Sequence, residues 1–332
     1  LTPGGQGLDT EPEARPNRGV LLMPRALPRV HPRRNKDRLL LPVLHVDVDR
    51  LEWLLSGSDG PIHGFAPYPE PVPQEIAERA VERAEALGVR PTSCVLALGP
   101  DLVTQRVLEL PVLPPRELGD VLGRRAAQAI GEDAEDDALF HARPYGVPAV
   151  DGGEEAESWT LHLQRRSFVR DLEQELFRRG VRVRRTVVAR TCLIARAAEL
   201  VGDSAETFVV LAGGPWETTV ALIHEGEVWF ETLLNTSITT DDPATHVTLV
   251  QELRHLGGWW RRNGRSAELE VVASVGIEEG VVELLEPAIR AALGAVRFVA
   301  GDGAVAPRLE ALAACRSTAP LAVELGLRPP VA

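Results

Sequence analysis

Residues 158–200, "SWTLHLQRRSFVRDLEQELFRRGVRVRRTVVARTCLIARAAEL", limit the possible folds of this chain most narrowly. Two runs typical of strands, "TLHL" and "VRVRRTVV", are separated by a helical pattern, and a second helical pattern follows them. A strand that returns through a helix to another strand is the crossover unit of a parallel or mixed sheet. The segment therefore predicts an α/β protein.

The same kinds of element recur on both sides of this segment. Before it, residues 39–57 predict two strands joined by a tight turn near Asp49 and Arg50, and later patterns predict more strands and helices. These lie at 73–91 (helix, stopped by Gly88), 92–99 and 103–111 (strands), 114–130 (helix) and 131–145 (an acidic connection into a strand).

From Phe208 onward the sequence predicts two or three strands, followed by helices and strands in alternation. The helices are expected at 244–264, 278–294, 304–316 and 320–327, and the strands at 267–276 and 295–301. This order favours two related halves, and 332 residues are enough for two hydrophobic cores.

Charge and hydropathy exclude some classes of partner. The formal net charge is -12 and the pI is about 5.3, so that nucleic acid and anionic lipid are not expected partners. No apolar run approaches the ~20 residues of a membrane-spanning helix, and we expect no direct membrane span. Cys94, Cys192 and Cys315 lie far apart in apolar surroundings and are interpreted as buried side chains in a reducing cytoplasm.

Residues 1–40 differ from the rest in composition. They are rich in Pro, Gly and Arg and show no strand or helix period, which predicts a flexible or loosely docked extension. Its basic residues, from Arg29 to Arg38, are interpreted as a solvated tail, with contact to a membrane surface or a partner as the alternative.

Three stretches resemble one family. The run "LALGPDLVTQRVLELPVLPPREL" (residues 96–118), the crossover at 161–197 and the ending "APLAVELGL" are similar to the type IV pilus assembly protein PilM. They are also similar to the cytoplasmic part of the type II secretion L subunit. Both belong to the actin-like ATPase superfamily, and the likeness covers roughly residues 41–328.

The resemblance implies an actin-like (ribonuclease H-like) fold of two lobes. The first lobe would span residues 41–205, with a small strand-helix-strand-strand insert at about 92–145, and the second lobe would span 206–332. In this superfamily two β-hairpins hold the nucleotide phosphates through backbone N–H groups, and an aspartate in each hairpin serves the metal or the attacking water.

The two hairpins keep only part of this pattern. In the first, Asp47 matches the aspartate, but Asp49 stands where the family has glycine, and a carboxylate repels phosphate. In the second, "VVLAGGPWETTVALI", Ala212 replaces the aspartate while Gly213 and Gly214 remain. Those glycines are interpreted as a plain turn, with residual anion binding as the alternative.

The third landmark, a glycine-rich turn against the adenosine, is reduced to Gly276. We therefore expect a pseudo-ATPase with no cofactor, in which Asp47, Gly213, Gly214 and Gly276 form a vestigial nucleotide site. The alternative is an ATP-binding, actin-like or sugar-kinase-like enzyme that uses ATP and Mg²⁺. Two neighbouring tryptophans, Trp259 and Trp260, are interpreted as helix-end packing rather than a base-stacking site.

The family also implies partners. By resemblance, this chain would be a cytoplasmic scaffold, peripheral to the inner membrane, that binds a short peptide of a membrane-anchored PilN-like protein and contacts other inner-membrane components of the machine. A type II secretion L-like domain cut before its membrane helix is a further alternative. We expect the peptide on the insert, at Val107, Leu108 and Leu110, in a small sheet formed by "LALG" and "RVLELP". Alternatively, that face packs on a neighbouring helix.

Overall fold

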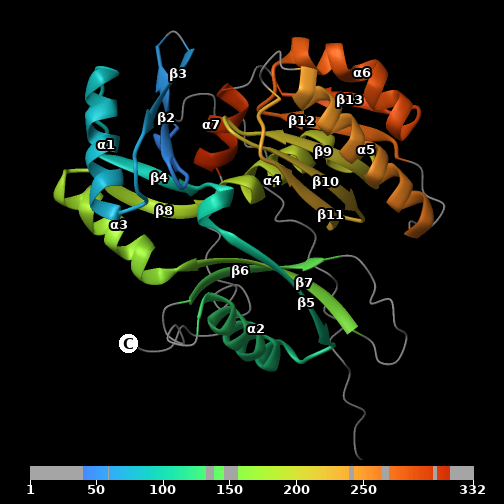
Figure 1. Cartoon of the computed structure of the whole chain (residues 1–332), viewed down its shortest axis with the longest axis horizontal. Coiled ribbons are helices and arrows are strands. Elements are labelled where there is room, and N and C mark those ends of the chain that lie inside the picture. Colours follow the sequence, from blue (N-terminus) through green and yellow to red (C-terminus); the bar gives the residue numbers. More distant parts are fainter. Residues whose placement is uncertain are drawn as a thin grey trace, which may run out of the picture.

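The computed structural model describes residues 40–58, 60–131, 138–145, 156–238, 243–263, 269–301 and 305–314. Most of the expected extension and the helix expected at 320–327 lie outside these residues. Within them the chain forms two lobes with an insert beneath (Figure 1), and the helices and strands alternate as the sequence predicts.

The first lobe is built on a five-stranded sheet in the order β3-β2-β1-β4-β8. Its strands are β1 (Val43–Val46), β2 (Arg50–Gly57), β3 (Gly60–Pro67), β4 (Ser93–Leu98) and β8 (Arg182–Val188). β1 runs parallel to β4 and antiparallel to β2. The strand β3 is not anticipated from the sequence, because "GPIHGFAP" contains glycines and prolines that favour turns.

The second lobe repeats this arrangement. Its part of the sheet has the order β11-β10-β9-β12-β13, which matches β3-β2-β1-β4-β8 strand for strand. The strands are β9 (Thr207–Gly213), β10 (Thr218–His224), β11 (Glu227–Leu234), β12 (Val271–Val275) and β13 (Arg297–Ala300). The two halves expected from the sequence are therefore related in topology.

Helices cover both faces of each sheet. On the outer faces, α1 (Pro73–Ala86) and α3 (Arg166–Arg178) cover the first lobe, and α5 (Pro243–Asn263) and α6 (Glu279–Leu293) cover the second. Between the lobes lie α4 (Ala189–Val201) and α7 (Val305–Ala314), whose apolar side chains enter the cores of both (Figure 1). Because both faces are covered, the central strands β1, β9 and β10 are buried along their whole length.

The insert consists of β5 (Thr104–Pro111), α2 (Pro115–Ile130), β6 (Ala138–Tyr145) and β7 (Ala156–Arg165), in the strand-helix-strand-strand order that was expected. Its expected bounds and its expected sheet are wrong. β4 is a buried strand of the first lobe between β1 and β8, because its residues are apolar on both faces, so "LALG" does not pair with "RVLELP". Instead β5 pairs with β7.

The insert also joins the second lobe. β6 pairs in parallel with β11 at Tyr145 and Val228, so that β6, β7 and β5 extend the second lobe's sheet to eight strands. On its other side β7 continues directly into α3 of the first lobe. The insert therefore connects the two lobes from below (Figure 1).

Candidate functional site

The first hairpin places Asp47 between the lobes at the end of β1. Its Oδ1 accepts hydrogen bonds from the backbone N–H groups of Val48, at 3.0 Å, and Asp101, at 3.1 Å. A methyl group at Gly99 would come within 2.6 Å of the Asp47 carboxyl carbon, so only glycine fits there. Burial, reinforced by the charge of Asp101, raises the pKa of Asp47 to about 6.

The second hairpin brings a carboxylate, Glu217, that belongs to no motif of the sequence. The turn between β9 and β10 closes with a hydrogen bond of 2.8 Å from the N–H of Gly214 to the carbonyl of Glu217. The Glu217 side chain folds back over Gly214, and only 4% of Glu217 is exposed. Burial, and then the charge of Asp47 in the other lobe, raise the pKa of Glu217 to about 7.

Trp216, at the tip of the same hairpin, crosses to the first lobe. Its ring centroid lies 5.1 Å from that of His45 on β1 and 6.0 Å from that of Phe65 on β3. The guanidinium of Arg50 lies over the same ring, 4.9 Å from its centroid. The Trp216 side chain therefore packs between the lobes.

A buried ion pair stands beside this tryptophan. Arg308 of α7 binds the carboxylate of Glu52 on β2, and both side chains are almost fully buried. The Nδ1 of His63 lies 3.3 Å from the other Glu52 oxygen. Burial alone would raise the pKa of Glu52, but Arg308 and His63 outweigh it and hold that pKa below its ordinary value. Burial and the charge of Arg308 lower the pKa of His45 to about 4.

The third landmark, Gly276, packs directly on the second hairpin. It has a φ of +75°, in the left-handed region that favours glycine. A methyl group at Gly213 would come within 2.7 Å of the Gly276 carbonyl oxygen, and the aliphatic part of Arg308 lies over Gly276. The structure thus brings three expected site residues, Asp47, Gly213 and Gly276, to the boundary between the lobes, with Gly214 beside them.

The charges at this boundary are mostly negative. Asp47, Glu52, Asp101 and Glu217 supply carboxylates, while Arg308 is already bound to Glu52 and Arg50 stacks on Trp216. Among the described residues no three histidine, cysteine or acidic side chains gather as metal ligands would. The ion pair between Glu52 and Arg308 cannot be predicted from local sequence patterns, because the two residues come from opposite ends of the chain.

The expected partner residues lie in different surroundings. In β5, Leu110 is 5% exposed and belongs to the core between α2 and the insert sheet, where Leu108 also packs. Val107 points to the opposite face by strand alternation and is 51% exposed. In the part of the chain that the structure describes, no strand pairs with the outer edge of β5.

Three further expectations concern the neighbouring tryptophans, the cysteines and membrane-spanning helices. Trp260 is buried in the second lobe's core and Trp259 packs beside Phe230, as the helix-packing interpretation requires. Cys94 and Cys192 are buried and are not joined in a disulfide, and Cys315 lies outside the described residues. No described helix is both long enough and apolar enough to span a bilayer.

No protein-family model and no curated protein matches this sequence. Solved structures do match the fold. In the structure of the PilM-PilN type IV pilus biogenesis complex, one chain superposes with a TM-score of 0.54 at 18% sequence identity, over 88% of this chain and 100% of that chain. The chain therefore has the two-lobed actin-like fold that the sequence resemblance implied.

Two other structures are similar at lower scores. A Bacteroides thetaiotaomicron protein with an actin-like ATPase fold has a TM-score of 0.46 at 9% identity, over 85% of this chain and 98% of its own. The cytoplasmic domain of EpsL, an inner-membrane component of the Vibrio cholerae type II secretion system, has 0.44 at 14% identity, over 83% and 96%.

Proposed function

We propose that this chain is a non-catalytic scaffold of a type IV pilus or type II secretion-like assembly. It would act in the cytoplasm, at the inner membrane, by holding a short peptide of a membrane-anchored PilN-like partner. The main support for a non-catalytic role is the contact between the lobes, where Trp216 packs against His45 and Phe65. That contact lies between the hairpins that grip phosphates in active members of the fold.

The residues present do not suit a magnesium–nucleotide complex. The turn at Gly213 lies against Gly276 with no room for even a methyl group between them. Arg308, a buried cation at this boundary, is already paired with Glu52, and the ionised carboxylates there repel a triphosphate. Ala212, in place of an aspartate, supplies no metal ligand or general base.

The binding role rests on the insert. Among the described residues β5 has an unpaired edge whose backbone groups can pair with an extended peptide. The exposed Val107 lies on this strand, and the exposed Val112 directly follows it. The fold is shared with a chain of the PilM-PilN complex over nearly the whole length. A peptide strand added to β5 would lie at the end of the eight-stranded sheet, away from the contact between the lobes.

Two measurements test the two parts of this proposal. In calorimetric titration, Mg-ATP should bind not at all or more weakly than millimolar; a micromolar Kd would overturn the pseudo-ATPase assignment in favour of the ATP-binding enzyme.

For partner binding, the probe is the cytoplasmic N-terminal peptide of a PilN-like protein from the same genome. Val107→Asp should lower its affinity at least about tenfold through lost apolar contact and repulsion of backbone carbonyls. The control Val247→Asp changes an equally exposed valine on α5 and should bind like the parent. Equal binding by the parent and Val107→Asp would show that β5 is not the docking edge.

A further inference from the structure

Four strand edges are unpaired among the described residues: those of β3 and β8 in the first sheet, and those of β13 and β5 in the second. β13 has only four residues and offers fewer backbone groups than the others. β8 carries charged side chains, which natural edge strands use to avoid pairing. These are Arg182, Arg184 and Arg185. The edges of β3 and β5 are therefore the ones to compare.

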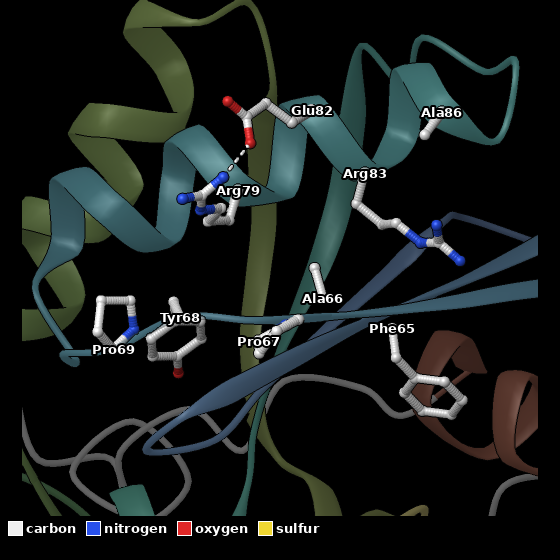
Figure 2. Close-up of a pocket in the computed structure, with 9 residues that line it drawn as sticks. All are labelled: Phe65, Ala66, Pro67, Tyr68, Pro69, Arg79, Glu82, Arg83 and Ala86. Atoms are coloured by element: carbon white, nitrogen blue, oxygen red, sulfur yellow. Dashed lines mark hydrogen bonds and ion pairs between the residues drawn. The ribbon is translucent and has the colours of Figure 1, made fainter.

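The edge of β3 borders a groove on the outer side of the first lobe (Figure 2). The groove has a volume of about 620 Å³ and is lined by residues 65–69 and by the face of α1 that carries Arg79 and Arg83. The guanidinium of Arg83 lies over Gly64 of β3, where a methyl group would come within 2.7 Å of Nε. Arg83 therefore covers the middle of β3 on the side that faces α1.

β3 has few backbone donors left for a further strand. In an antiparallel ladder, residues bonded to the partner strand alternate with residues whose N–H and C=O turn to the opposite edge. Pro61 and Pro67 have no N–H to give to β2, so these positions and the alternate ones between them turn outward. Within β3, His63 and Phe65 are then the residues that supply outward N–H groups. Prolines on an edge strand oppose the addition of another strand.

The outer edge of β5 has more donors, and two prolines fix which residues supply them. Pro144 of β6 lies opposite Trp159 of β7 and cannot donate to it, so the backbone groups of Trp159 turn toward β5, where Leu108 lies opposite. Leu108 is therefore bonded to β7, and the residues that alternate with it turn their N–H and C=O groups outward. These are Gln105, Val107 and Glu109. Pro111, in step with them, ends this run of donors.

The two faces of β5 differ in chemistry. Leu108 and Leu110 pack in the core between α2 and the insert sheet, and Arg106 lies on the same face by strand alternation. Val107 and Glu109 lie on the opposite face, and both are exposed. Arg106 and Glu109 have opposite charges, and neither forms an ion pair with another described residue. Each can therefore pair with a charge that a ligand brings.

We propose that the ligand of β5 is a short peptide that adds antiparallel to this strand and carries charges complementary to it. The peptide has apolar side chains opposite Val107 and Leu108. It has a basic residue opposite Glu109 and an acidic residue three positions further along, opposite Arg106. Side chains directly opposite each other on paired strands are close enough for these contacts. This inference rests on the function proposed above, because it specifies the peptide of that function.

Hydrogen exchange of the full-length chain tests the position of the added strand. The probe is the cytoplasmic N-terminal peptide of the PilN-like protein, added to saturation. It should slow the exchange of the three outward amides, at Gln105, Val107 and Glu109, by at least about tenfold relative to the free chain. The amides of Arg106 and Leu108 should change much less, because they already bond to β7.

Two synthetic peptides test the charge pattern. One is threonine-leucine-lysine-valine-valine-glutamate-threonine, which puts its lysine opposite Glu109, and the other has glutamate in place of that lysine. In calorimetric titration the lysine peptide should bind the parent at least about fivefold more tightly than the glutamate peptide. Glu109→Lys should reverse this preference. The control Glu283→Lys, at an exposed glutamate of α6, should leave the preference unchanged.

Several results would overturn the proposal. Protection at His63 and Phe65, in place of the three amides of β5, would move the peptide to β3. Equal or undetectable binding of the two synthetic peptides, or a preference that survives Glu109→Lys, would contradict the charge pattern.

The proposed function and this inference fail separately. If the PilN-like peptide does not bind while the lysine peptide protects the three amides, the function is wrong and the assignment of the β5 edge stands. If the PilN-like peptide binds without protecting those amides, the function stands and the assignment of the edge is wrong.

Discussion

Arg308 and Glu52 form a buried ion pair although 256 positions separate them in the sequence. One lies on the last described helix, the other on the second strand of the first lobe. Because the helix that carries Arg308 follows the whole second lobe, the pair ties the end of the fold to its beginning. Loss of this ion pair should therefore lower the stability of the whole fold.

Replacing Arg308 should strongly destabilise the protein. Arg308→Met leaves the Glu52 carboxylate buried without its main counter-charge, which we expect to lower the free energy of unfolding by about 3–5 kcal/mol. The control Arg79→Met removes the exposed pair with Glu82 and should cost less than about 1 kcal/mol. Urea unfolding measures both; similar midpoints for the two variants would contradict the prediction.

Glu217 should make stability depend on pH. Its folded pKa of about 7 lies above the ordinary value of 4.5, so the folded state binds the extra proton. The contribution is favourable below about pH 4.5, declines as the pH rises through 7, and is absent above it. Glu217→Gln cannot ionise and should gain up to about 3 kcal/mol over the parent at pH 8, with little difference at pH 5.

The measurement for Glu217 is the difference in melting temperature between variant and parent across this pH range. Comparing differences cancels the titration of groups remote from Glu217, which both proteins share. Glu225→Gln, at an exposed position eight residues along, should show no such trend. A difference that stays constant from pH 5 to pH 8 would mean that Glu217 is already ionised in the folded state.

Substitutions at Leu110 and Val107 should differ in their effect on stability, because Leu110 is buried in the insert core and Val107 is exposed on the same strand. Leu110→Ala removes a side chain from the insert core and should cost about 2–5 kcal/mol, whereas Val107→Ala should stay within about 0.5 kcal/mol. Thermal unfolding of the full chain checks both. If the two variants lost equal stability, Val107 would have to be covered, and β5 could not present it to a peptide.

The extension should be dispensable for folding. A chain that begins at Leu40 keeps Leu40 and Leu41, which pack against the first lobe near α7. It should be soluble and melt within a few degrees of the parent, because the preceding residues show no core-forming pattern. An insoluble product, or a melting temperature far below that of the parent, would show that the extension is an integral part of the fold.

The sequence predicted the elements with strong periodicity and missed those set by tertiary contacts. The crossover through α3 and the buried strand β9 are evident because their apolar positions follow one period. β3 was missed since an edge strand tolerates glycine and proline. β4 was placed in the wrong sheet because an apolar run indicates a buried strand but not its neighbours.

The candidate site shows the same division. Asp47, Gly213 and Gly276 were found because they occupy positions of a known pattern. Glu217 and the Glu52–Arg308 pair match no local motif, and their importance comes from burial and from neighbours remote in the chain. The packing of Trp216 on His45 could not be inferred without the relative position of the lobes.

The pairing of Tyr145 with Val228 has a consequence for synthesis on the ribosome. The insert strand β6 is made long before β11, so the edge of β6 that β11 will cover stays open while more than eighty residues are still being translated. Open strand edges are where nascent chains associate wrongly. We expect this protein to depend on timely emergence of its second half, and chains stalled before residue 234 to be the form that chaperones retain.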